Sequence, residues 1–197
     1  MVSDLIINRA QGCLLGQLIG DALGSLVEFQ SPEEIRRSYP EGVRELADGG
    51  TWNTIAGQPT DDSEMALLLA RMLTELGAYD PNAALQAYQF WLDSDPFDWG
   101  MTIATGLRGC PNPDSQANGA MMRISPLGIF GANHPLETVG DWAKQDAALT
   151  HPNPVCLQAN SLFTMAIAHA IASGCEAGKL YQNIKQRAAD LAVDPAL

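Results

Sequence analysis

The hydrophobic residues of this chain recur mostly three or four positions apart, the interval that gathers side chains on one face of an α-helix. This pattern predicts helices over residues 4–27, 62–76, 81–93, 100–108, 135–149, 155–173 and 176–192. No segment alternates apolar and polar residues over more than a few positions, as a half-buried strand does. The pattern therefore predicts an all-α protein, a compact multi-helix bundle with functional loops between its helices.

Turn and capping residues mark where several helices begin and end. Gly77 and Gly174 directly follow two apolar segments and predict their C-terminal ends. Ser31, with Glu34 three residues later, has the signature of a capping box at the start of a short helix. Residues 29–59 are otherwise irregular, and Pro126 is expected to cut the short apolar segment 120–130.

The first predicted helix carries glycine at every fourth position, at residues 12, 16, 20 and 24. Each glycine costs a helix about 0.5–1 kcal/mol relative to alanine, so four of them need an explanation. Residues four apart share one face, and a face without side chains lets another group approach the backbone closely. Tight packing of a second helix and close approach of a ligand both explain the pattern.

Composition and charge narrow the function classes. The 197 residues are 46% hydrophobic, which suits one domain, residues 1–197, with a sizeable core. The formal net charge is −12, and no basic stripe interrupts the acidic balance, so the chain is not expected to bind nucleic acid. An acidic protein that holds a phosphorylated ligand needs metal ions or helix N-termini to do so.

The cysteines and the apolar segments indicate a cytoplasmic protein outside the membrane. Four cysteines show no CxxC spacing, and a chain of this size does not need disulfides. The N-terminal sequence lacks the basic and long apolar regions of a signal peptide. The longest apolar stretches are interrupted by polar residues or are too short to span a bilayer.

The sequence "GQPTDDSEM", residues 57–65, places two aspartates side by side just before an apolar helix. One interpretation is structural: Thr60, Asp61 or Asp62 caps the helix, and the acids favour the positive end of its dipole. The other is a metal site. Adjacent residues of a helix point about 100° apart, but at a helix N-cap their side chains can converge on one ion or hold two. Such oxygen ligands favour Mg²⁺, Ca²⁺ or Mn²⁺ over zinc.

Other polar residues lie at the predicted helix ends, and each has a structural explanation beside a functional one. Asp98 is suited to capping the helix that follows it, and Asn118-Gly119 is typical of a turn. His151, which precedes a proline, is more often a loop histidine than a catalytic one. The chain contains no HExxH zinc motif, no P-loop, no GxSxG elbow and no GxGxxG after a strand.

Taken together, four segments are more specific than any one of them. In order they read "GQLIGDALGSLVEF", "GQPTDDSEMALLLAR", "ANGAMMRISPLG" and "LTHPNP". This combination resembles the ADP-ribosylglycohydrolase family, to which the dinitrogenase reductase-activating glycohydrolases belong. The resemblance runs from about residue 9 to about residue 172 and implies the compact all-α bundle of that family.

The resemblance also implies an activity and a site. The expected reaction is hydrolysis of the glycosidic bond between ADP-ribose and an acceptor, which is a protein side chain such as arginine or serine, or a small molecule. Two divalent cations, Mg²⁺ or Mn²⁺, are expected, with Thr60, Asp61 and Asp62 as the first group of ligands. Asp61 and Glu28 are the expected catalytic residues, since a carboxylate stabilises the oxocarbenium-like centre of glycosidic cleavage. The residues expected to contact the substrate are Asp98, Asn118, Gly119, Met122, Arg123 and His151.

One expected feature of the family has no counterpart in these 197 residues. Family members carry a second acidic metal-binding segment near their C-terminus, and no such run occurs here. Three interpretations follow: a fragment of a longer protein, a shortened relative that binds ADP-ribose or serves a structural role without catalysis, or a site completed by another chain. The last two predict a homo-oligomer, because incomplete bundles expose apolar helix faces.

Overall fold

The computed structural model describes residues 3–197, so positions 1 and 2 of the predicted domain lie outside the described residues. Its helices are α1 (Asp4–Gly24), α2 (Pro32–Ser38), α3 (Asp61–Leu76), α4 (Pro81–Asp93), α5 (Met101–Leu107), α6 (Ser125–Phe130), the 3-10 helix η1 (Gly131–Asn133), α7 (Leu136–Ala148), α8 (Pro154–Ser173) and α9 (Ala177–Asp190). Within these residues the β structure is limited to one isolated bridge between Gly49 and Thr54. The all-α prediction is confirmed.

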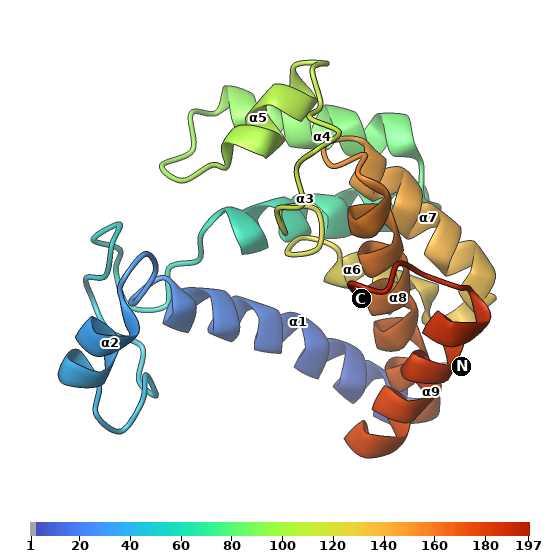
Figure 1. The fold of residues 1–197 in the computed structure, drawn as a ribbon, viewed down its shortest axis with the longest axis horizontal. Helices are drawn as coiled ribbons and strands as arrows, with labels where there is room; N and C mark the ends of the chain where they lie inside the picture. Colours follow the sequence, from blue (N-terminus) through green and yellow to red (C-terminus); the bar gives the residue numbers. More distant parts are fainter. Residues whose placement is uncertain (1–2) are drawn as a thin grey trace.

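The helices pack around a core to which α3, α4 and α5 contribute most. Its buried members include Met65, Leu69, Tyr88, Ile124 and Leu127. Helix α8 lies against α6, α7 and α9, and α1 runs along the side of the bundle in contact with α3, α6 and α8 (Figure 1). Helix α2 and its loops lie at the far end of α1, away from α8 and α9 (Figure 1). The turn after α1 therefore lies near the segment that leads into α3.

Most of the expected helix ends are confirmed, and two are corrected. The capping box of Ser31 and Glu34 starts α2, and left-handed Gly77 and Gly174 end α3 and α8. Helix α1 ends at Gly24 rather than at residue 27, because residues 25–29 form turns, and the backbone of Ser25 and Leu26 lies against Gly50. Pro126 does not cut a helix but lies in the first turn of α6, where its missing N–H costs no hydrogen bond.

Helix α8 corrects the expectation that every apolar stretch is too short to cross a membrane. In residues 3–197, α8 alone is long and apolar enough to do so, with 20 residues and a mean hydropathy of 1.4 in its most apolar window. Its contacts with α6, α7 and α9 explain this composition, since the central helix of a bundle is apolar on several sides.

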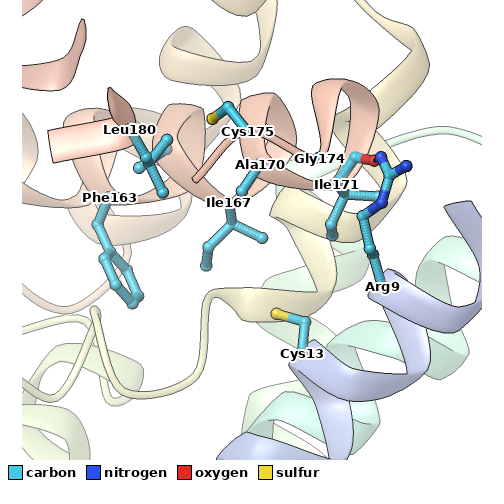
Figure 2. A pocket seen from close by; sticks show the side chains of 10 residues that line it. Arg9, Cys13, Phe163, Ile167, Ala170, Ile171, Gly174, Cys175 and Leu180 are labelled. Atoms are coloured by element: carbon cyan, nitrogen blue, oxygen red, sulfur yellow. Dashed lines mark hydrogen bonds between the residues drawn. The ribbon is translucent and has the colours of Figure 1, made fainter. Parts of the chain in front are cut away.

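The glycine face of α1 has no partner within residues 3–197. A Cβ atom added at any of its four glycines would meet nothing within 4 Å, so neither of the two expected explanations is realised in the described residues. An apolar groove of about 570 Å³ lies beside it, between α1 and the α8–α9 pair (Figure 2). There the Arg9 guanidinium donates to the carbonyl of Ile171 at 2.5 Å and ties the start of α1 to the end of α8.

Candidate active site

A second cavity, of about 320 Å³, gathers polar residues from five separate segments. Glu28 reaches it from the turn after α1, and Asp61 and Asp62 from the first turn of α3. Asp98 comes from the loop before α5, and His151 from the loop before α8. The remaining expected residues that line it are Asn118, Gly119 and Met122. The larger apolar groove has no carboxylate in its lining, so the smaller cavity is the candidate site.

Asp21 of α1, rather than the "TDDS" segment itself, caps α3. Its carboxylate accepts hydrogen bonds from the backbone N–H of Thr60 at 3.0 Å and from that of Ser63 at 3.1 Å. The N-cap residue Thr60 makes no capping bond with its own side chain. An acid from another helix thus satisfies the exposed N–H groups of α3, and the carboxylates of Asp61 and Asp62 are left free to face the cavity.

Thr60 lies beside the cavity but does not line it. Its hydroxyl donates to Asp21 Oδ1 at 2.7 Å, and the residue is buried. A hydroxyl that donates its hydrogen keeps its lone pairs, so this contact is compatible with Thr60 as a metal ligand. Asp98 is not the cap of the next helix either, since α5 begins after Gly100 and has no side-chain cap.

Four acidic side chains line the cavity, and no cationic side chain among the described lining residues offsets them. Burial, and then the neighbouring carboxylates of Asp98, Asp62 and Glu28, together raise the pKa of Asp61 to about 8. Burial, then Asp21, raises the pKa of Asp62 to about 6, and burial, then Glu28, raises that of Asp98 to about 6. No lysine or arginine is among the described residues that line the cavity.

This donor set fits a hard divalent cation only in part. Carboxylate and hydroxyl oxygens are the ligands that Mg²⁺ and Mn²⁺ prefer, and a cation would offset the burial and the repulsion that raise these pKa values. In residues 3–197, however, no three acidic, histidine or cysteine side chains are grouped closely enough to hold an ion by themselves. Asp61 and Asp62 therefore supply part of a coordination shell.

Gly119 and His151 form the floor of the cavity. A Cβ atom at Gly119 would lie 2.9 Å from Ile103 Cδ1 and 3.0 Å from His151 Cε1, so only glycine fits there without a shift. His151 is fully buried, its Nδ1 lies 2.8 Å from the Thr150 hydroxyl, and its Nε2 has no partner among the described residues. Burial, and then Arg123, lowers the pKa of His151 to about 4, so the imidazole is neutral at pH 7.

Arg123 is corrected from a substrate contact to a support of the cavity floor. The side chain is fully buried and points into the core, where Nε pairs with Asp146 Oδ1 at 3.0 Å. The guanidinium also lies 4.2 Å from the centre of the Tyr88 ring, and Tyr88 donates to the same carboxylate. A buried arginine needs such a partner. Asp146 lies 23 residues further along the chain, and no local sequence pattern indicates that it pairs with Arg123.

Two further positioning contacts were not expected from the sequence. Gln17 of α1 donates to the backbone carbonyls of Asp62 at 3.2 Å and Met122 at 2.9 Å, and so joins the two sides of the cavity. Trp52 donates from Nε1 to Glu28 Oε2 at 2.7 Å. Gln17 stood out only as a polar residue in an apolar helix, and Trp52 as one aromatic residue in an irregular segment.

Comparison with known proteins agrees with this architecture. The family model described as ADP-ribosylglycohydrolase matches residues 2–196. The chain belongs to the ADP-ribosylglycohydrolase family. A solved structure titled "ADP-ribosylglycohydrolase-related protein complex" superposes with a TM-score of 0.80 at 27% identity, over 98% of this chain and 66% of that one.

Among its relatives, this ADP-ribosylglycohydrolase family member is similar to two enzymes named for their substrates. It is 35% identical over 165 residues to the ADP-ribosyl-dinitrogen reductase glycohydrolase of Rhodospirillum rubrum, over 79% of this chain and 55% of the relative. It is 30% identical over 162 residues to the ADP-ribosylarginine hydrolase Tri1 of Pseudomonas putida, over 74% of this chain and 42% of the relative. The chain therefore spans about half the length of these relatives.

Proposed function

We propose that this protein hydrolyses the glycosidic bond between ADP-ribose and an acceptor side chain, with arginine as the acceptor. The observation that carries the proposal is the cavity in which Glu28, Asp61 and Asp98 face the Asn118–Gly119 turn and His151. The names of the two relatives support the reaction, and that of the Pseudomonas enzyme supports the acceptor. A guanidinium is a planar cation, and the excess of carboxylates suits it better than a neutral hydroxyl acceptor.

In this proposal the carboxylates and the cavity floor have different tasks. Cleavage builds positive charge on the ribose carbon, and the carboxylates of Glu28 and Asp61 stabilise that charge. The Asn118–Gly119 turn, Met122 and His151 hold ADP-ribose, and neutral His151 Nε2 offers a hydrogen bond that is unused among the described residues. Asp98, which lines the same cavity, contacts the acceptor.

Thr60, Asp61 and Asp62 would hold divalent cations, Mg²⁺ or Mn²⁺. When bound, these ions supply a Lewis acid that orients the ribose hydroxyls and offsets the anionic diphosphate of the ligand. The protein itself excludes water from the floor through buried Ile103 and His151, and Asp21 fixes the first turn of α3 from which the carboxylates project. Further ligands from outside the described residues would complete the shell.

The test is release of ADP-ribose from an ADP-ribosylated arginine peptide in the presence of Mg²⁺ or Mn²⁺. Turnover that Asp61→Asn abolishes, and that a chelator stops reversibly, is the expected result. Asp141→Asn, which removes an exposed carboxylate on α7, is the matched control and retains activity. Turnover that survives chelation would overturn the metal requirement. Tight binding of ADP-ribose without release would support a binding protein instead of an enzyme.

A further inference from the structure

The loop that contains the Gly49–Thr54 bridge closes over the turn that carries Glu28. The Thr51 hydroxyl donates to the backbone carbonyl of Glu28 at 2.5 Å, and Trp52 Nε1 donates to its carboxylate at 2.7 Å. Gly50 makes the approach possible, since it has a φ of +73° and a Cβ atom there would lie 2.7 Å from the Ser25 carbonyl oxygen. One short loop therefore holds both the backbone and the side chain of Glu28.

The ring of Trp52 also contacts both of the segments that carry Glu28 and Asp98. Its centroid lies 6.3 Å from that of Phe29, the residue after Glu28, with the rings edge to face. It lies 6.1 Å from the centroid of Phe97, the residue before Asp98, again edge to face. Trp52 itself does not line the cavity, whereas Glu28 and Asp98 do. The aromatic contacts of Trp52 are thus with Phe29 and Phe97, the residues next to Glu28 and Asp98 in the sequence.

The turn at Glu28 contains a residue in a strained backbone conformation, which contacts from the neighbouring loop help to stabilise. Phe29 has a φ of +59°, in the left-handed region that a bulky residue rarely adopts. Its side chain is 81% exposed, so burial of the ring does not stabilise this conformation. The turn's own hydrogen bond, from the Gln30 N–H to the Val27 carbonyl at 3.1 Å, closes it, and the contacts from Thr51 and Trp52 add to that bond.

We propose that Trp52 is a positioning residue that sets the place of the Glu28 carboxylate relative to Asp98, which lines the same cavity. The indole N–H occupies Oε2 of Glu28, and Oε1 has no hydrogen-bond partner among the described residues, so it is free for the substrate. The aromatic contacts with Phe29 and Phe97 fix the spacing of the two loops. This assignment rests on the proposed function, because Glu28 acts there on the developing positive charge.

The first experiment detects the hydrogen bond between Trp52 and Glu28 by NMR and does not depend on enzymatic turnover. The chain has four tryptophans, and each gives one indole N–H signal in a proton–nitrogen NMR spectrum. The Trp52 signal is assigned by its loss in Trp52→Phe, and it is expected to move when Glu28→Gln weakens the acceptor. Trp91 is the matched control, since its Nε1 donates to Glu64 Oε2 at the same 2.7 Å. Glu64→Gln should move the Trp91 signal and leave that of Trp52 in place.

The second experiment asks whether the contact acts through Glu28. Trp52→Phe keeps a ring but loses the N–H, and should lower kcat about tenfold with KM changed less than twofold. In a Glu28→Gln background the same substitution should have almost no further effect, because the carboxylate to be positioned is gone. Trp91→Phe, which also loses an indole-to-carboxylate bond, should have the same effect in both backgrounds.

Two results would overturn the assignment. One is a Trp52 indole signal that does not respond to Glu28→Gln. The other is a loss of kcat in Trp52→Phe that adds fully to that of Glu28→Gln, since this is the behaviour of a purely structural residue. Gly50→Ala is a further variant, which should displace the loop and move the Trp52 signal while Trp52 itself is intact. Absence of turnover in the wild-type protein would overturn the proposed function, and the NMR arm would still decide whether Trp52 holds Glu28.

Discussion

Asp21 shows how one side chain frees the carboxylates at a helix start to line the candidate site. An aspartate at the start of a helix ordinarily binds the free N–H groups of its own first turn. Here Asp21 of α1 occupies those groups of α3, and Asp61 and Asp62 project into the cavity instead. The cap that one interpretation of "TDDS" assigned to this segment therefore comes from α1, and the carboxylates of α3 line the cavity.

Replacing Asp21 by alanine should reduce both stability and activity. The variant loses the acceptor for the N–H groups of Thr60 and Ser63, which costs about 1–2 kcal/mol of unfolding free energy. Urea denaturation measures this loss, and an ADP-ribose release assay measures the displacement of Asp61 and Asp62. Asp80→Ala is the control, because Asp80 caps α4 through Asn82 and Ala83, away from the cavity. Equal activity in the two variants would contradict a role of Asp21 in positioning.

His151 makes stability depend on pH in a defined direction. Its pKa in the folded protein is about 4, against the ordinary 6.5, so between these values the unfolded chain binds a proton that the folded chain does not. The contribution of neutral His151 is complete above pH 6.5 and is lost as the pH falls towards 4. Wild type should therefore lose roughly 2 kcal/mol more than His151→Gln between pH 7 and pH 5.

Urea unfolding of both proteins at pH 7 and pH 5 measures this difference. The comparison with His151→Gln cancels the contributions of the carboxylates, which both proteins share. His134→Gln removes an exposed histidine and serves as the control for the substitution itself. A change of equal size in wild type and His151→Gln would show that His151 is protonated alike in the folded and unfolded states.

At the level of elements, the buried pair of Arg123 and Asp146 joins the Asn118–Gly119 segment to α7. Arg123 follows that segment directly, and its Nη2 also donates to the Asp146 backbone carbonyl at 3.0 Å. The cavity floor is thus supported by an ion pair whose two residues do not line the cavity. This explains how a residue of the "NGAMMR" motif serves the site without lining it.

Breaking this pair should destabilise the whole fold. Arg123→Met leaves the Asp146 carboxylate buried and unpaired, which costs about 3–5 kcal/mol. The double variant Arg123→Met with Asp146→Leu removes both charges and should recover most of that loss. Chemical denaturation of the three proteins measures the coupling. Arg187→Met, which breaks a partly exposed pair with Glu137, is the control and should cost less than about 1 kcal/mol.

The elements that the sequence predicts well are those with local signals. Gly77, Gly174 and the Ser31 capping box act within four residues, and all three have the expected structure. The contacts that the sequence does not reveal join distant segments: Asp21 with Thr60, Trp52 with Glu28, and Arg123 with Asp146. Each depends on how helices pack, and a polar residue has the same local pattern whether its partner is water or a buried group.

At the scale of the whole molecule, the protein is strongly acidic, and its cavity is more acidic still. The formal net charge is −12, and Glu28, Asp61, Asp62 and Asp98 line one cavity without a lysine or arginine in its described lining. Burial, and then the like charges at short range, raise the pKa values of three of these acids and so make their ionised forms unfavourable in the folded chain. A bound cation would remove that repulsion, so cation binding and folding stability should be linked.

Mn²⁺ should therefore raise the melting temperature of the protein. A ligand that binds only the folded state adds about 2.7 kcal/mol at a hundredfold excess over its Kd, which corresponds to roughly 5–10 °C for a chain of this size. Differential scanning calorimetry with and without Mn²⁺ measures the shift, and a chelator should reverse it. Asp62→Asn should raise the melting temperature without metal, because one like charge is gone, and should reduce the shift with Mn²⁺. Asp141→Asn is the control, and it should change neither the melting temperature without metal nor the shift with Mn²⁺. Equal Mn²⁺ shifts in Asp62→Asn and Asp141→Asn would mean that Mn²⁺ binds elsewhere on the acidic surface.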